Sequence, residues 1–259
     1  MGMASNPVVI MSSVLVAGHI FVLGYNTIRR IYRTFRPFKV GIYGPSMTGK
    51  TTLDQYLTVP GDIEPIPEAL RTTPRVDSSG RPILAKAHRK EIRWKKERHP
   101  ISNADVAGQS QFRNLWVDDM FSRKVDIVIF MVDNRFDYTS PEYSPQATQE
   151  AVASLQYLIE NITRKNVSKE ISRKAKKHAR TDYKPTIFCF MINKMDKWWS
   201  PYYHNLWDMD LQRQHPAVQP FKEQLSILRK AGVRAEVEAI SAQTGMRVPQ
   251  VFIKLLELL

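Results

Sequence analysis

Cysteine is nearly absent from the sequence. Among 259 residues only Cys189 is present, which excludes an internal disulfide and a disulfide-stapled fold. That cysteine lies in an apolar run, 186–192, where we expect an inert buried thiol rather than a nucleophile. Folding without disulfides is typical of a reducing compartment, so we expect the folded part of the chain to face one.

Acidic residues are also scarce. The chain has 25 Asp and Glu against 38 Lys and Arg, a formal net charge of +13. This charge predicts attraction to an anionic partner, which can be a lipid surface, an RNA-containing machine or an acidic protein face; no direct DNA binding is expected. Two basic insertions of unassigned role contribute to it, 74–100 and 164–184, and we interpret the second as a helix end followed by an exposed loop.

The N-terminal segment lacks charge altogether between residues 8 and 25. A helix of this length spans roughly 27 Å at about 1.5 Å per residue, which suits a thin bilayer such as that of the ER. Apolar residues fall on every face, which argues against a helix lying in the membrane plane. A signal peptide fits poorly, since no basic residue precedes the run and no small-residue cleavage site follows it. We therefore predict an N-terminal membrane anchor helix over residues 1–28.

Basic residues crowd the C-terminal side of this predicted helix, and none precedes it. The positive-inside rule then places the chain from residue 30 onward in the cytosol. We interpret residues 29–37 as a basic juxtamembrane linker, whose arginines suit contact with anionic headgroups. The basic residues of this flank are Arg29, Arg30, Arg33, Arg36 and Lys39.

Beyond residue 37, apolar runs of strand length alternate with helical patterns. This alternation predicts one α/β domain over 38–259 with a largely parallel sheet, whose central strands are apolar on both faces. The segment 134–147 shows no clear period. Expected strands are 38–43, 126–132, 186–192 and, more weakly, 235–240; expected helices begin near Lys50 and cover 109–122, 148–163, 221–231 and 248–259.

A glycine-rich loop joins the first expected strand to the first expected helix. Residues 44–51 read GPSMTGKT and fit the pattern G-x-x-x-x-G-K-[ST]. Gly44 and Gly49 let the backbone curl so that its N–H groups face phosphates. Lys50 is expected to reach the β- and γ-phosphates, and the Thr51 hydroxyl to bind Mg²⁺. Further nucleotide contacts are expected from Ser46, Met47, Thr48 and Thr52.

Two further segments suit the metal and the γ-phosphate. Residues 105–109 read DVAGQ, in which Asp105 is expected to reach Mg²⁺ through water, the Gly108 amide to sense the γ-phosphate, and Gln109 to orient attacking water. A switch threonine is expected between the loop helix and the next strand. We prefer Thr73 to Thr72 as the Mg²⁺ ligand, and the alternative is that both hydroxyls cap a turn.

A base-binding pattern follows the strand at 186–192. Residues 193–196 read NKMD, at the strand end where open α/β sheets bind ligands. The Asp196 carboxylate can accept two hydrogen bonds from guanine, and adenine offers no equivalent pair. The Lys194 stem can lie on the base while Asn193 ties the loops together. After the last strand, Ser241 and Ala242 can present a backbone amide to guanine O6.

Together these motifs resemble the Ras-like small GTPases, and within them the Arf branch. The likeness is carried by GKTT at 49–52, by DVAGQ continuing through Arg113 to Leu115-Trp116, and by SAQTG at 241–245. It implies a P-loop GTPase domain with a six-stranded, mostly parallel sheet flanked by helices, and nucleotide-dependent switches around Thr73 and 105–116. The predicted anchor resembles that of the β-subunit of the signal recognition particle receptor.

These patterns favour a membrane-anchored GTPase switch with its domain facing the cytosol, which binds GTP or GDP with Mg²⁺ and recruits a protein effector. Lys50 and Gln109 are its candidate catalytic residues, and hydrolysis is expected to be slow without an activating partner. The alternative is a docking or receptor subunit that holds GTP without cleaving it. The nucleotide that stays with the purified protein over hours discriminates the two.

Overall fold

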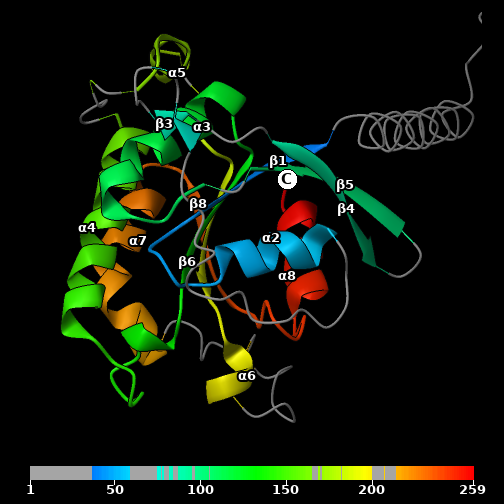
Figure 1. Cartoon of the computed structure of the whole chain (residues 1–259), viewed down its shortest axis with the longest axis vertical. Helices are drawn as coiled ribbons and strands as arrows, with labels where there is room; N and C mark the ends of the chain where they lie inside the picture. Colours follow the sequence, from blue (N-terminus) through cyan, green and yellow to red (C-terminus); the bar gives the residue numbers. More distant parts are fainter. Residues whose placement is uncertain are drawn as a thin grey trace, which may run out of the picture. The chain divides into compact units, whose positions relative to one another are not determined.

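The computed structural model describes residues 37–58, 75–76, 78, 82–83, 87–94, 97–104, 106–164, 169, 171–181, 183–199, 207 and 214–259 (Figure 1). The chain divides at Pro37, and the unit from Phe38 to Leu259 holds the sheet. The predicted anchor 1–28 lies outside the described residues, as does the linker 29–37 except for Pro37. Among the helices that are described, none combines the length and apolarity needed to cross a bilayer.

One six-stranded sheet forms the centre of this unit, in the order β4-β5-β1-β6-β7-β8. Five neighbouring strands run parallel, and β4 pairs antiparallel with β5 at one edge. The expected six-stranded, mostly parallel α/β sheet is confirmed, and each expected strand matches to within one residue. The strands are β1 (Phe38–Tyr43), β4 (His88–Trp94), β5 (Glu97–Asn103), β6 (Ile127–Val132), β7 (Ile187–Ile192) and β8 (Arg234–Ala239).

The central strands are buried on both faces because helices cover the sheet on both sides. Every residue of β6 and β7 is buried, and successive side chains alternate between two apolar clusters. Phe130 and Phe190 stack in one cluster at 6.2 Å between ring centroids, whereas Met131 and Cys189 lie in the other. Burial raises the pKa of the Cys189 thiol, so this side chain is inert, as expected.

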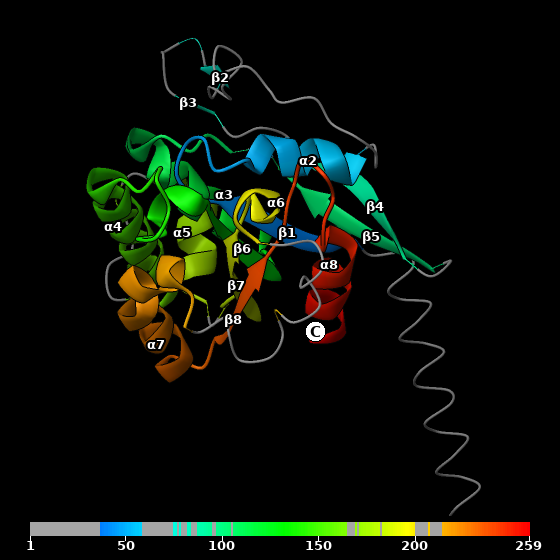
Figure 2. The same cartoon turned by 90° about the horizontal axis from the view of Figure 1, so that it is seen from below.

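The helices divide between the two faces, as Figure 2 shows. Core residues of α3, α4, α5 and α7 join the cluster that contains Phe130, and those of α2 and α8 join the cluster that contains Met131. The short helix α6 follows β7. The bounds are α2 (Lys50–Thr58), α3 (Arg113–Arg123), α4 (Pro145–Ile162), α5 (Arg173–Ala179), α6 (Met195–Trp198), α7 (Lys222–Lys230) and α8 (Val248–Glu257).

Helix α4 begins three residues earlier than expected, inside the segment that shows no clear period. The Ser144 side chain accepts a hydrogen bond from the Ala147 N–H, and Pro145 occupies the first turn, where its missing N–H costs nothing. The preceding residues form a short 3₁₀ helix, Asn134–Phe136. The cap and the proline, rather than apolar periodicity, mark this helix start.

The basic insertion 164–184 contains a separate helix, α5, so its interpretation as a helix end and an exposed loop is wrong in that part. Ser172 caps α5 by accepting from the Ala175 N–H. Ala175 and Ala179, one turn apart, are buried against the core. Only these two small side chains pack against the core. Because lysines surround them, the sequence shows no apolar periodicity that would predict the helix. The insertion 74–100 holds β4, part of β5 and the two-stranded pair β2 (Arg75–Val76) and β3 (Pro82–Ile83).

Candidate functional site

The loop between β1 and α2 takes backbone conformations that glycine permits. Gly44 and Gly49 have φ of 136° and 90°. A Cβ on Gly44 would lie 2.2 Å from the Met131 carbonyl oxygen, and one on Gly49 would lie 2.2 Å from Asn193 Nδ2. Met47 also has a positive φ, 68°, which is uncommon for a side chain of this size. The two glycines therefore suit the conformation of the loop, whereas Met47 adopts one that its residue type disfavours.

Side chains hold the carbonyl groups of this loop. The Pro45 carbonyl accepts from Lys50 Nζ at 2.6 Å and from Thr48 Oγ1 at 3.1 Å. The Thr48 carbonyl accepts from Asn193 Nδ2 at 2.8 Å. In a trans peptide the N–H points opposite to the C=O, so the N–H of the following residue is directed to the other side of the backbone. This arrangement fits a phosphate cradle built from backbone donors.

Gly108 of the DVAGQ segment packs directly against the loop. A Cβ on Gly108 would lie 2.4 Å from Lys50 Nζ and 2.8 Å from the Pro45 carbonyl, so only glycine fits there. The Ala107 carbonyl accepts from Trp116 Nε1 at 2.7 Å, which ties the segment to α3. Gln109 Oε1 is buried and, within the described part of the chain, has no hydrogen-bond partner. A buried acceptor left unpaired is costly unless something absent from the protein alone satisfies it.

The loop after β7 joins two motifs through one side chain. Asn193 is 3% exposed, and its Oδ1 accepts from the Ala242 N–H at 2.9 Å while its Nδ2 holds the Thr48 carbonyl. Lys194 has a φ of 59° and starts α6, and Asp196 lies in the first turn of that helix. Ser241 and Ala242 are buried after β8. The structure thus brings 44–52, 108–109, 193–196 and 241–242 together.

Two residues of the site were missed by the sequence analysis. Asp133 follows β6 and is fully buried, and its carboxylate receives Lys194 Nζ at 2.9 Å and Arg135 Nε at 2.9 Å. Arg135 Nη2 also donates to the Ser46 carbonyl at 2.9 Å. The available signal was position, because an acidic residue directly after a buried strand lies at the ligand-binding edge of a parallel sheet.

The predicted metal ligands are only partly described. Thr51 lies in the first turn of α2, whereas Asp105, Thr73 and Thr72 lie outside the described residues. Within the described ranges, no cluster of three or more acidic, histidine or cysteine side chains is placed to hold a metal. The Mg²⁺ ligand set Thr51, Thr73 and Asp105 therefore stays a prediction.

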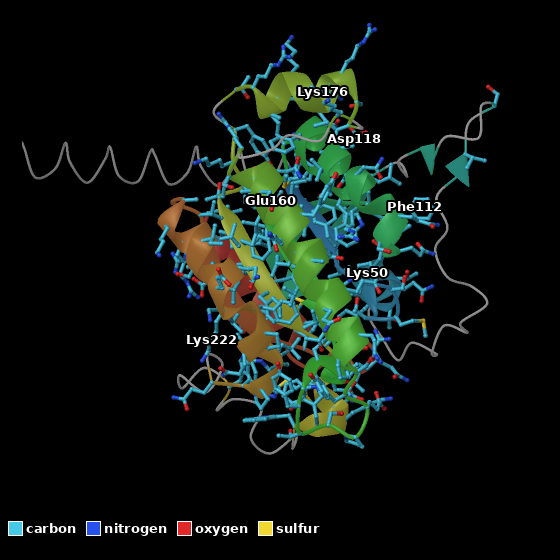
Figure 3. The ribbon with its side chains drawn as sticks, turned by 90° about the vertical axis from the view of Figure 1, so that its left-hand side faces the viewer. Lys50, Phe112, Asp118, Glu160, Lys176 and Lys222 are labelled. Carbon is cyan, nitrogen blue, oxygen red and sulfur yellow. The ribbon has the colours of Figure 1, made fainter. Side chains whose placement is uncertain are left out.

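The glycine-rich loop lies away from the basic helix α5. Figure 3 shows Lys50 at the start of α2 and Lys176 on α5, separated by α3 and α4 in that view. Partial burial and the charges of Lys124, Lys174 and Lys177 lower the pKa of His178 on α5. The exposed positive charge of α5 is thus concentrated apart from the loop, and α5 contributes nothing to the site.

No protein-family model matches the chain, and no curated protein matches it. Among solved structures it is similar to the translation elongation factor SelB from Methanococcus maripaludis in complex with the GTP analogue GppNHp, with a TM-score of 0.45 and 16% identity over 86% of this chain and 34% of that one. It is also similar to the bacterial selenocysteine-specific elongation factor EF-Sec, with a TM-score of 0.45 and 18% identity over 86% of this chain and 29% of that one. The chain spans about a third of the length of these proteins. Neither of these two structures is an Arf-branch protein or a subunit of the signal recognition particle receptor.

Replacing the linking amide should weaken both the site and the fold. In Asn193→Ala the Thr48 carbonyl and the Ala242 N–H lose their partner, which should lower the free energy of unfolding by about 3 kcal/mol. Urea unfolding of nucleotide-free protein, followed by circular dichroism, measures this. Gln156→Ala removes an exposed amide bonded to Glu160 and should change stability by less than about 0.5 kcal/mol. Equal stability of the two variants would contradict the linking role.

Proposed function

We propose that this chain is a GTPase that binds a guanine nucleotide with Mg²⁺ and hydrolyses GTP. One observation carries the proposal: the phosphate loop, the DVAGQ segment, the NKMD loop and the Ser241-Ala242 turn meet at one edge of the sheet. Lys50 Nζ adjoins Gly108, and Asn193 bonds both Thr48 and Ala242. Four segments that each suit one part of the same nucleotide thus occupy one site.

Guanine selection is proposed to rest on Asp196. Its carboxylate has two acceptor oxygens and belongs to the first turn of α6, which follows Asn193 in the chain. The Asn193 amide holds the loops together. Guanine presents N1–H and the 2-amino group as paired donors, which a carboxylate can accept. The buried Ser241-Ala242 turn is proposed to face guanine O6. In the protein alone both of its N–H groups are bonded, Ser241 to the Met246 carbonyl at 3.0 Å and Ala242 to Asn193 Oδ1 at 2.9 Å, so a contact with O6 requires one of these bonds to be exchanged.

Asp196→Asn should change which base the protein prefers. An amide offers one acceptor and one donor, which matches the 2-carbonyl of xanthine better than the 2-amino group of guanine. GDP affinity should fall by at least about 100-fold while XDP binding is gained, because the mismatch leaves buried polar groups unpaired. Competition of GDP and XDP against a fluorescent nucleotide measures both. Unchanged GDP preference would remove Asp196 from base recognition, and ATP competing as well as GTP against the unaltered protein would refute the guanine site.

Hydrolysis is proposed to depend on Gln109 and Lys50. Gln109 has a buried Oε1 for which the described residues supply no hydrogen-bond partner, and it directly follows Gly108, which packs against Lys50 Nζ. In the proposed mechanism that oxygen accepts a hydrogen bond from the attacking water and orients it, while Lys50 balances negative charge on the phosphates. Mg²⁺ would add a Lewis acid at the phosphates, held by Thr51, Thr73 and Asp105.

Gln109→Leu should slow the chemical step without weakening nucleotide binding. Leucine keeps the side-chain volume but cannot orient water, so single-turnover GTP hydrolysis should fall by about 100-fold. The GTP dissociation rate should change less than threefold. Quenched samples of preloaded protein, analysed for GTP and GDP, give the rate. An unchanged rate would take Gln109 out of the mechanism, and GTP that persists for hours on the unaltered protein would favour the non-hydrolysing docking subunit.

We extend the proposal to an Arf-like, membrane-anchored switch whose domain faces the cytosol and recruits a protein effector in its GTP state. The motif runs at 105–116 and 241–245 support the branch. The uncharged segment 8–25 and the arginines that follow it support the anchor, with the ER as the proposed membrane. The basic charge of the chain also suits contact with an RNA-containing machine.

The anchor has a direct test in cells. The full chain should remain in the membrane pellet after alkaline carbonate extraction, because a spanning helix resists removal whereas a peripheral protein is released. A chain limited to 38–259 should appear in the supernatant of the same extraction. Release of the full chain by carbonate would refute a spanning anchor and leave the nucleotide site untouched.

A further inference from the structure

The guanidinium of Arg135 links two loops by way of Asp133. One is the phosphate loop, residues 44–51, and the other is the base loop, residues 193–196. Arg135 Nε contacts both carboxylate oxygens of Asp133, at 2.9 and 3.1 Å, and its Nη2 donates to the Ser46 carbonyl at 2.9 Å. The Arg135 backbone N–H also bonds the same carboxylate at 3.2 Å, and the guanidinium carbon lies 5.8 Å from the centre of the Phe136 ring. These contacts fix the orientation of the guanidinium before any ligand binds.

The contact with Ser46 determines how one peptide group of the loop is turned. The Ser46 carbonyl and the Met47 N–H belong to the same trans peptide and point in opposite directions. A donor that holds the carbonyl therefore aims the Met47 N–H at the opposite side of the backbone. Met47 needs this help because its φ of 68° is disfavoured for a residue with a side chain.

The neighbouring peptides of the loop are held in the same way. Lys50 and Thr48 hold the Pro45 carbonyl, and Asn193 holds the Thr48 carbonyl. Lys50 and Asn193 belong to the motifs that the sequence analysis recognised. Arg135, 89 residues from Ser46, supplies the corresponding contact for the peptide between them.

Charge favours this arrangement further. Asp133 is fully buried and pairs with two cations, Arg135 and Lys194, so the three groups together carry one positive charge beside the loop. A cation bonded to a carbonyl polarises the peptide and makes its N–H a stronger donor to an anion. The same carboxylate also holds Lys194 Nζ, which belongs to the base loop.

We propose that Arg135 is a positioning residue that holds the Ser46–Met47 peptide with its N–H turned toward the nucleotide phosphates, and that Asp133 couples this contact to Lys194 of the base loop. The inference rests on the proposed guanine-nucleotide site. It adds that Arg135 and Asp133 slow the release of nucleotide from that site. Arg135 acts through the backbone of the loop and through Asp133.

The test measures nucleotide release from the full chain, purified in detergent micelles and loaded with N-methylanthraniloyl-GDP. After a chase with excess GDP, Arg135→Gln should release the probe about tenfold faster than the unaltered protein, the effect of one charge-assisted hydrogen bond. Arg135→Lys keeps a cationic donor but loses the planar group that bonds Asp133 and Ser46 at once, so its release rate should lie between those of the unaltered protein and Arg135→Gln. Asp133→Asn should also accelerate release, and the double variant should show less than the product of the two effects because both changes break one network.

Arg234→Gln is the matched control, because it removes an arginine of similar ion pairing, with Glu236 at 2.7 Å, at the start of β8. It should release at the unaltered rate. Failure of the unaltered protein to bind the probe would refute the proposed function itself. Binding by the unaltered protein with unaltered release from Arg135→Gln would overturn only the role of Arg135. Equally fast release from the Lys and Gln variants would also overturn it, since a cationic donor would then have no effect.

Discussion

The buried amide of Asn193 is the contact on which the site depends. Its nitrogen donates to the Thr48 carbonyl and its oxygen accepts from the Ala242 N–H, so one planar group sets the spacing of three loops. Both bonds are buried, and leaving a buried amide without hydrogen bonds costs free energy. Positions of the loops that keep both bonds are therefore strongly favoured. The phosphate loop and the base loop are therefore held in register by the protein itself.

The sheet makes that contact possible, and a second polar network secures the sheet. Parallel strands bring the carboxyl ends of β1, β6, β7 and β8 to one edge, where ligands of open α/β sheets bind. At the end of β1 the buried Tyr43 hydroxyl donates to Asp119 at 2.8 Å, and burial raises the pKa of this tyrosine. Arg123 pairs with the same carboxylate and donates to the Val40 carbonyl at 3.0 Å, which joins α3 to β1. The hydrogen bonds to α3 thus hold the end of β1 from which the phosphate loop begins.

The sequence predicted the sheet and the recognised motifs because both leave local signals. Strands 127–132 and 187–192 are unbroken apolar runs, and the loop pattern at 44–51 has fixed spacing. Helix α5 was misread because only two alanines among lysines carry its packing. Arg135 was missed because its partner lies 89 residues away, and no local pattern reports such a contact. Asp105 and Thr73 stay predictions, since they lie outside the described residues.

The distance along the chain between the partners of Asn193 has a consequence for biosynthesis. Asn193, the partner of Thr48, is synthesised 145 residues after it. Ala242, the second partner of Asn193, follows 49 residues later. At roughly 5–20 residues per second, the first interval alone lasts roughly 7–30 s. During that time the growing polypeptide carries a glycine loop that no downstream amide yet holds. The glycine loop can therefore reach its final conformation only after the segment that carries Asn193 has been synthesised.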